Sequence, residues 1–118
     1  MVEVEVAQRP EGLVVVRLAG EIDLSQAEAV RRAFDRVLAA GPAGVLIDLC
    51  DLRFLAVAGV DQIDAAVGEI SRQGRAVAVV CTDRGPVARI VALLGLDRQW
   101  PLHHDLALAM ASVRDGTG

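Results

Sequence analysis

The histidine and cysteine side chains are the residues of this chain best suited to binding a metal or acting as a nucleophile. His103 and His104 are adjacent, and neighbouring strand residues point to opposite faces of a sheet, so we do not expect both to bind one metal ion. Asp105 follows them and is expected to cap the next helix. Cys50 and Cys81 each end an apolar run, and we expect two reduced, buried thiols. A Cys–His nucleophile pair and a disulfide are the alternatives that the sequence leaves open.

The other polar residues form no recognisable catalytic pattern. The chain contains no Tyr, and all of its twelve basic residues are Arg. It has no Gly-x-Ser-x-Gly motif and no phosphate-binding glycine loop. Asp23, Asp48 and Asp51 lie near the ends of expected strands and could converge, although polar residues along the edge of a sheet are the commoner interpretation. We therefore predict that the protein is not an enzyme and has no metal site and no cofactor.

Charge and composition exclude two classes of partner. The net charge is −4 with no cluster of basic residues, so nucleic-acid binding is not expected. The first six residues alternate apolar and acidic side chains, which is unlike a signal peptide. No apolar run approaches the roughly 18 residues of a membrane-spanning helix. We expect a cytoplasmic protein that does not insert into a membrane.

The hydrophobic pattern predicts one α/β domain. Residues 2–6 alternate Val and Glu, the period of a half-buried strand, and residues 45–49 form the apolar run typical of a strand buried on both faces. Further strands are expected at 13–19, 76–81 and around 100–102, and helices at 25–40, from near 59 to 73, at 86–94 and at 105–113. With right-handed crossovers, these elements give a mixed, mostly parallel sheet of four to five strands with about four helices packed on it. This domain is assigned to residues 1–114, with a frayed tail at 115–118.

The connections between these elements are also predicted. The first two strands are expected to form a hairpin around the Glu11–Gly12 turn. Residues 20–24 are expected to be a loop, after which Ser25 and Glu28 fit a capping box at the start of the first helix. Residues 50–55 are interpreted as a connector that leads to a turn of small residues, where Gly59 begins the second helix. Such a turn beside a helix N-terminus suits contact with a partner, although on the residues alone a plain strand-to-helix connection is the commoner interpretation.

Four segments together resemble a known family, the STAS domain of bacterial anti-sigma-factor antagonists. They occur in the family's order and spacing and span essentially the whole chain: Leu18-Ala-Gly-Glu-Ile-Asp-Leu-Ser25, Val45-Leu-Ile-Asp-Leu49, Phe54-Leu-Ala-Val-Ala-Gly-Val60 and Leu93-Leu-Gly-Leu-Asp-Arg98. The resemblance implies a mixed sheet with packed helices, which agrees with the predicted order of elements. It also implies partner switching, in which the unmodified antagonist binds an anti-sigma factor, often an ATP-dependent serine kinase, and phosphorylation of a serine breaks the complex.

The resemblance places the docking site at two segments. In the family, the second helix begins with Asp-Ser-Ser-Gly; here these positions are Ala56, Val57, Ala58 and Gly59. Ala58 stands where the phosphorylated serine would be and has no hydroxyl group, so the familiar switch cannot operate there. The predicted partner-docking residues are Asp23, Leu24, Ala56, Val57, Ala58, Gly59, Val60 and Asp61. Asp61 either imitates the phosphorylated state in part or merely complements the helix dipole.

The function that the resemblance implies is a non-catalytic interaction module that binds an anti-sigma factor, of the serine-kinase type or another, or a related regulatory protein, without the usual phosphorylatable serine. Two alternatives stay open. The first is a STAS subunit of a larger assembly, such as a stressosome-like scaffold or a lipid-transport ABC complex. The second is a STAS domain that senses a small ligand. Thr82 is the hydroxyl residue to check first for phosphorylation at another position.

Overall fold

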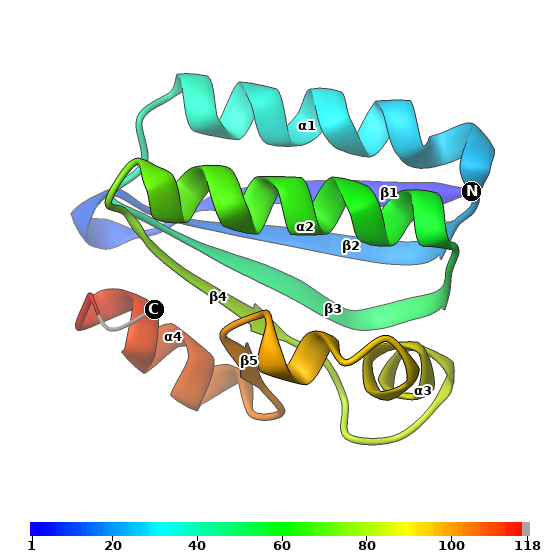
Figure 1. Ribbon diagram of the computed structural model, residues 1–118. Helices are drawn as coiled ribbons and strands as arrows, with labels where there is room; N and C mark the ends of the chain where they lie inside the picture. Colours follow the sequence, from blue (N-terminus) through cyan, green and yellow to red (C-terminus); the bar gives the residue numbers. More distant parts are fainter. Residues whose placement is uncertain (117–118) are drawn as a thin grey trace.

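The computed structural model describes residues 1–116 and confirms the predicted architecture of one mixed sheet with packed helices (Figure 1). The sheet order is β1-β2-β3-β4-β5, with β1 antiparallel to β2 and all other neighbours parallel. The strands are β1 (Val2–Gln8), β2 (Leu13–Ile22), β3 (Gly44–Leu55), β4 (Ala76–Val80) and β5 (Leu102–His103). The helices are α1 (Ala27–Ala39), α2 (Val57–Arg72), α3 (Pro86–Leu93) and α4 (Leu106–Arg114), and three short 3-10 turns are η1 (Pro10–Gly12), η2 (Leu24–Gln26) and η3 (Leu96–Arg98).

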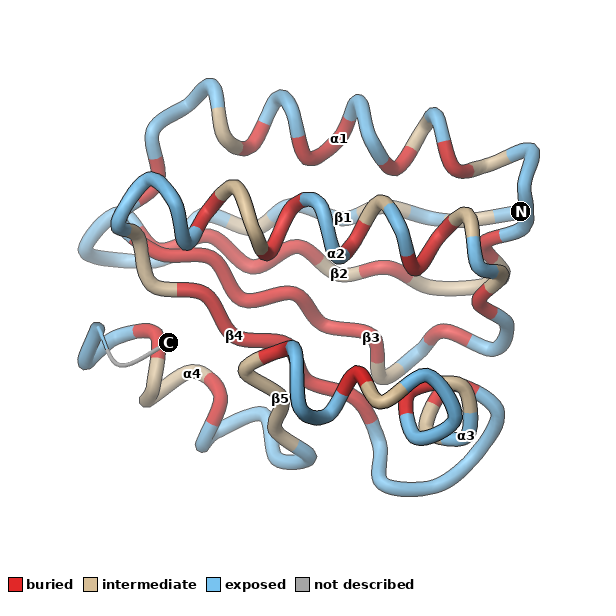
Figure 2. Tube along the Cα trace, in the orientation of Figure 1, coloured by how far each residue is buried: buried red, intermediate tan, exposed pale blue. Residues whose placement is uncertain are grey.

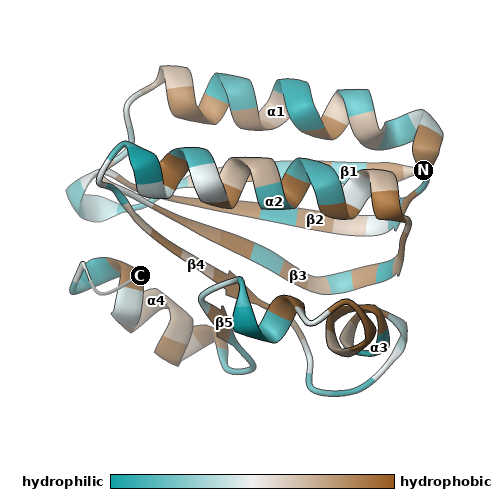
Figure 3. Cartoon of the chain, in the orientation of Figure 1, coloured by the Kyte–Doolittle hydropathy of each residue, from teal (hydrophilic) through white to brown (hydrophobic). Residues whose placement is uncertain are grey.

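The helices divide unequally between the two faces of the sheet. Buried residues of α1, α2 and α3 join one large cluster with β2, β3 and β4, and α4 packs through Ala109 and Val113 on the opposite face. Strands β2 to β4 are accordingly apolar and mostly buried, while the outward turns of α1 and α2 carry polar side chains (Figures 2 and 3). The single helix α4 leaves part of the second face open to solvent. Charged side chains of β2 and β3 form ion pairs on this open part, such as Arg17 with Asp51.

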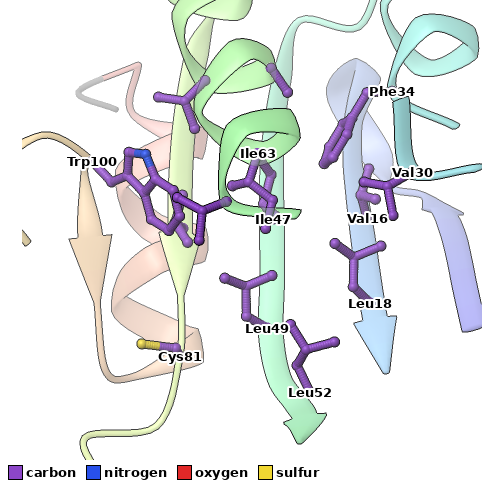
Figure 4. Packing of buried hydrophobic residues seen from close by; sticks show 14 of the residues in the cluster. Val16, Leu18, Val30, Phe34, Ile47, Leu49, Leu52, Ile63, Cys81 and Trp100 are labelled. Atoms are coloured by element: carbon purple, nitrogen blue, oxygen red, sulfur yellow. The ribbon is translucent and has the colours of Figure 1, made fainter. Parts of the chain in front are cut away.

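The core is built almost entirely from aliphatic side chains. Val30 and Phe34 of α1 pack in the same cluster as Val16 of β2, and Ile63 of α2 packs there with Ile47 of β3 (Figure 4). Their apolar positions recur at helical spacing, so burial of one helical face is the main force that holds α1 and α2 on the sheet.

The tryptophan departs from its predicted place in a strand. Trp100 follows η3, before β5, and is buried, and its indole N–H donates to Asp64 Oδ1 at 3.0 Å. A buried indole needs such an acceptor, and pairing with β4 begins after Trp100, at Leu102.

Strand β3 is longer than predicted, so residues 50–55 are strand and not a connector. A shift in register after Arg17 lets β2 pair with β3 again from Ala19 opposite Asp51 to Ile22 opposite Leu55. Residues 20–22 are likewise strand rather than loop. Exposed charged residues and a second register shift obscure the pattern. The shift, between Gly20 and Glu21, leaves Arg53 without a partner in the ladder, and its side chain forms an ion pair with Glu21.

The capping box lies at η2, the turn before the first helix, and uses different residues from those predicted. Asp23, not Ser25, is the capping residue: its Oδ1 accepts from the Ser25 N–H at 2.9 Å, and its own N–H donates to Gln26 Oε1 at 3.1 Å. Glu28 pairs with Arg31 instead. The capping box therefore begins two residues earlier, because η2 precedes α1 and its first N–H groups also need acceptors.

The last helix begins as predicted, with Asp105 Oδ1 accepting from the Leu108 N–H at 2.9 Å. After α4, the N–H groups of Asp115 and Gly116 donate to Ala111 and Val113 carbonyls. The remainder of the predicted tail, residues 117–118, lies outside the described residues. Among residues 1–116, no helix is both long enough and apolar enough to cross a membrane.

Candidate docking surface

The eight predicted docking residues come from two segments that the fold brings together at one end of the sheet. Strands β2 and β3 are parallel, so Asp23 and Leu24 leave the sheet at the same end as Ala56 and the start of α2 (Figure 1). The Ala56 N–H donates to the Ile22 carbonyl at 2.8 Å, and η2 contacts α2. We call Asp23, Leu24 and residues 56–61 the docking surface.

Gly59 allows this close approach of the second helix to the end of β2. A Cβ atom at position 59 would lie 2.6 Å from Ile22 Cγ2 and 2.8 Å from Leu55 Cδ1, both in a fully packed part of the core. The glycine is therefore required by packing, since its φ angle is not in the left-handed region. The second helix also begins two residues before the predicted Gly59, because the Gly59 and Val60 N–H groups both donate to the Ala56 carbonyl.

The predicted docking residues differ in exposure: some could touch a partner, and others are buried beneath them. Leu24 and Val57 are 79% and 64% exposed, and Asp23 and Asp61 are also exposed. Ala56 and Ala58 are half-buried between them. Gly59 and Val60 are buried, so they position the surface and present little to a partner.

One further apolar side chain near this end of the sheet was absent from the predicted docking residues. Phe54, near the end of β3, is 49% exposed, while its neighbour Leu55 is buried. Strict alternation would place Phe54 on the buried side with Leu52, and the register shift at Arg53, which the sequence does not reveal, is what turns it outward.

Asp23 is held as a carboxylate by its capping bonds. The Ser25 hydroxyl donates to Asp23 Oδ1 at 2.6 Å, and this bond, with the Ser25 and Gln26 backbone N–H groups, lowers the pKa of the Asp23 carboxyl below its ordinary value. A negative charge thus stands beside the exposed Leu24 at neutral pH. The same carboxylate complements the free N–H groups at the start of η2.

The lowered pKa of Asp23 predicts a pH-dependent contribution to stability. Because the pKa is lower in the folded than in the unfolded chain, the stabilisation is complete above the unfolded pKa and is lost as pH falls through the folded pKa. We expect Asp23→Asn, whose amide oxygen can still cap, to abolish this part of the acid sensitivity. Urea midpoints measured from neutral to acid pH should converge for the two chains at low pH; parallel curves would contradict this.

The two cysteines lie on opposite faces of the sheet. Cys81 belongs to the cluster under α1, α2 and α3 (Figure 4), and Cys50 packs with the cluster under α4. Both thiols are free; Cys81 is buried as expected, but Cys50 is only half-buried. Burial, together with the nearby Asp48, raises the pKa of Cys50 to about 12, and burial raises the pKa of Cys81. Neither thiol is therefore activated as a nucleophile.

This placement predicts slow thiol chemistry. At pH 8 the native protein should react with iodoacetamide far more slowly than glutathione does, because the thiolate is the reacting species and a pKa near 12 leaves almost none of it. Unfolding in urea should restore an ordinary rate at both positions. Mass spectrometry after timed quenching would measure this, and rapid native labelling of Cys50 would contradict the structure.

The remaining candidate residues do not form a reactive cluster. His104 Nδ1 lies 3.0 Å from the Cys81 carbonyl oxygen, and Asp48 Oδ1 accepts from the Cys50 N–H, so both serve the backbone. Thr82 is exposed in the β4–α3 loop, where its hydroxyl donates to the Arg84 carbonyl at 2.7 Å. Within residues 1–116, His, Cys, Asp and Glu side chains form no group of three that could hold a metal ion.

The fold has a five-stranded mixed sheet in which β2 leads into the capped turn η2 and β3 leads into α2. This arrangement defines a class of protein, and the family comparison names it. The STAS-domain family model matches residues 4–109, and the chain belongs to that family. It is 37% identical over 106 residues to the anti-sigma-F factor antagonist RsfB of Mycobacterium tuberculosis, covering 89% of this chain and 84% of that protein.

Solved structures agree with this assignment. An anti-sigma factor antagonist from Mycobacterium paratuberculosis superposes with a TM-score of 0.88 at 30% identity, over 98% of this chain and 96% of that one. The unphosphorylated form of the anti-sigma factor antagonist SpoIIAA superposes with a TM-score of 0.68 at 19% identity, over 95% of this chain and 98% of that one, which supports the fold alone.

Proposed function

We propose that this STAS domain is an anti-sigma factor antagonist that binds an anti-sigma factor through the docking surface. The observation that carries the proposal is the pairing of exposed apolar side chains, Leu24 and Val57, with the fixed carboxylate of Asp23 on one preformed edge. Apolar anchors surrounded by polar groups are typical of protein interfaces. The 37% identical relative that is called an anti-sigma-F factor antagonist supports the same function.

We further propose that docking in this protein is not switched by phosphorylation at the second helix. Ala56, Val57 and Ala58 form the N-terminus of α2 without a hydroxyl or carboxyl group. An apolar turn favours a drier contact than a turn with two serines would. Asp61 is exposed in the second turn of α2, so its charge lies beyond the first turn, where the helix dipole acts most strongly.

The proposal is tested by affinity capture from the native cytoplasm with this chain as bait, with and without ATP. Recovery of an anti-sigma factor, followed by direct binding of the purified pair in calorimetry, is the expected result. Recovery of a membrane ATPase would instead indicate the subunit of a lipid-transport complex, and recovery of large STAS assemblies would indicate a scaffold. A captured kinase that phosphorylates the wild-type chain, for which Thr82 is the first position to map, would show that docking is switched at a position outside the second helix.

Restoring the missing hydroxyl group gives a prediction about the kinase type of partner. Ala58 is half-buried in the first turn of α2, and we expect Ala58→Ser to become phosphorylated by a serine-kinase anti-sigma factor and to lose affinity for it once modified, because the added phosphate carries a charge of about −2 into the interface. The matched control is Ala65→Ser, an exposed position two turns further along α2. Phosphate transfer would be followed by intact-protein mass spectrometry. Equal modification of both variants would contradict docking at position 58.

A further inference from the structure

We propose that the protein forms a symmetric dimer in which β1 pairs with β1 of a second copy, in antiparallel register, with Val6 facing the partner's Val6. The dimer continues the sheet from one chain into the other and leaves both docking surfaces free. The proposal does not depend on the function proposed above, because it concerns the outer edge of β1, whereas the docking surface lies at the ends of β2 and β3.

The sheet has two edges of very different length. Strand β5 has only two residues, which is one way in which proteins blunt an edge. Strand β1 has seven residues, and on its outer side no strand of residues 1–116 pairs with it. An open edge of this length presents a row of unpaired backbone groups that suits pairing with another strand.

The hydrogen bonds of β1 show which residues point outward. The Arg9 N–H donates to the Leu13 carbonyl, and the Glu21 N–H donates to the Met1 carbonyl. In an antiparallel ladder the bonding direction alternates, so residues 1, 3, 5, 7 and 9 bond to β2. The backbone groups of Val2, Val4, Val6 and Gln8 therefore point to the free edge.

Side chains alternate in the same way. Glu3, Glu5, Ala7 and Arg9 lie on the face of the sheet that carries α4, where they line the same shallow cavities as Arg17. Val4, Val6 and Gln8 lie on the other face, in a groove of about 250 Å³ between β1 and α1. Val6 is 45% exposed, an unusual position for a valine that is already part of a sheet.

The charged side chains of β1 favour one of the antiparallel registers in which two copies of the strand could pair. With Val6 opposite Val6, each Glu3 faces the partner's Arg9, and each Glu5 faces the partner's Ala7. These are the closely spaced positions of an antiparallel pair, where side chains interact most strongly. A shift of the partner by two residues in one direction places Glu5 against Glu5, and the next shift places Glu3 against Glu5. Both are disfavoured by like charge.

A shift in the other direction is disfavoured by geometry. It would place Glu5 opposite the partner's Arg9, but the ladder would then run into Pro10, which has no N–H and begins the η1 turn. The Val6-centred register is thus the longest one without a repulsive pair. It also covers Val6 and the open side of the groove, so apolar area is removed from water.

The test is a charge reversal read out by sedimentation velocity over a range of protein concentrations. Glu3→Arg places Arg against Arg twice in the dimer, and Arg9→Glu places Glu against Glu twice, so each variant should dimerise at least about tenfold more weakly than wild type. A mixture of the two variants should restore a dimer, because both cross-pairs are then Arg with Glu. Glu5→Arg is the control on the same strand and face, and it should dimerise like wild type, because its partner is Ala7.

A backbone variant tests the strand pairing itself. Val6→Pro removes an outward N–H that makes no bond within the chain, so the monomer should keep its circular dichroism spectrum and the dimer should be lost. A wild-type chain that stays monomeric at every concentration would overturn the proposal and leave the edge open to a strand of another protein. A dimer that survives all of these changes, or a mixture that fails to restore it, would overturn it equally.

Discussion

Replacing Gly59 with alanine should lower the free energy of unfolding by about 1–3 kcal/mol, although alanine is the better helix former. The added Cβ would lie 2.6 Å from Ile22 Cγ2 and 2.8 Å from Leu55 Cδ1, and both side chains are buried in the core, so either they or the helix must shift. A tilt of the first turn of α2 away from the end of β2 would also strain the bond from the Ala56 N–H to the Ile22 carbonyl. Urea denaturation at neutral pH measures the loss.

The same helix provides the control for this substitution. At Gly68 a Cβ would meet only the Arg72 guanidinium group, at 3.4 Å, and that side chain is flexible and largely exposed. We expect Gly68→Ala to raise the free energy of unfolding by about 0.5–1 kcal/mol, the usual gain from replacing glycine inside a helix. The two alanines therefore act in opposite directions. A stabilising Gly59→Ala would show that α2 can move away from Ile22 without cost.

Changing Val57 to aspartate should weaken binding to the anti-sigma factor by about tenfold to a hundredfold, because a carboxylate is then buried in an apolar contact without a partner. Val57 is 64% exposed, so the free protein loses little packing. It is also the first residue of α2, where a negative charge is favourable to the helix. The loss should therefore appear in the affinity, measured by calorimetry, and not in the stability of the free chain.

Leu108 offers a close match for Val57 as a control. It is also 64% exposed and lies in the first turn of a helix, but on α4, on the opposite face of the sheet (Figure 1). Leu108→Asp should leave the affinity unchanged. If both variants weaken binding equally, the contact is not confined to the docking surface, and if neither does, the partner binds elsewhere.

Much of the fold could be predicted because its core elements carry unambiguous patterns. The alternation in residues 2–6 and the apolar run in 45–49 identified two strands, and the helical spacing of residues such as Ile63 identified the helices. The end of β3 was missed because its side chains are partly charged. Arg53 looks like a loop residue in sequence, and only the partner strand, which brings Glu21 beside it, makes it a strand residue.

The proximity of the two candidate segments was predictable from the sequence, but their local geometry was not. The four-segment pattern named two segments that the structure places side by side, and their role in docking stays a prediction. The sequence could not show that Gly59 is a packing residue, because the atoms that exclude a side chain come from Ile22, distant in the chain. Nor could it separate Asp23 from Ser25 as the cap, since both residue types serve equally well and the choice depends on where β2 ends.

The hydrogen bond from the Ala56 N–H to the Ile22 carbonyl, together with the close packing of Gly59 on Ile22, affects the entropy of partner binding. The two halves of the docking surface cannot move independently, so complex formation orders few backbone torsions and its entropy cost falls mainly on the side chains of the rim. Calorimetry should accordingly give a negative heat-capacity change of the size expected from apolar area alone, without the excess that accompanies folding on binding. The partner would meet a surface that already has its bound shape, and differences in affinity among variants would reside mostly in the dissociation rate.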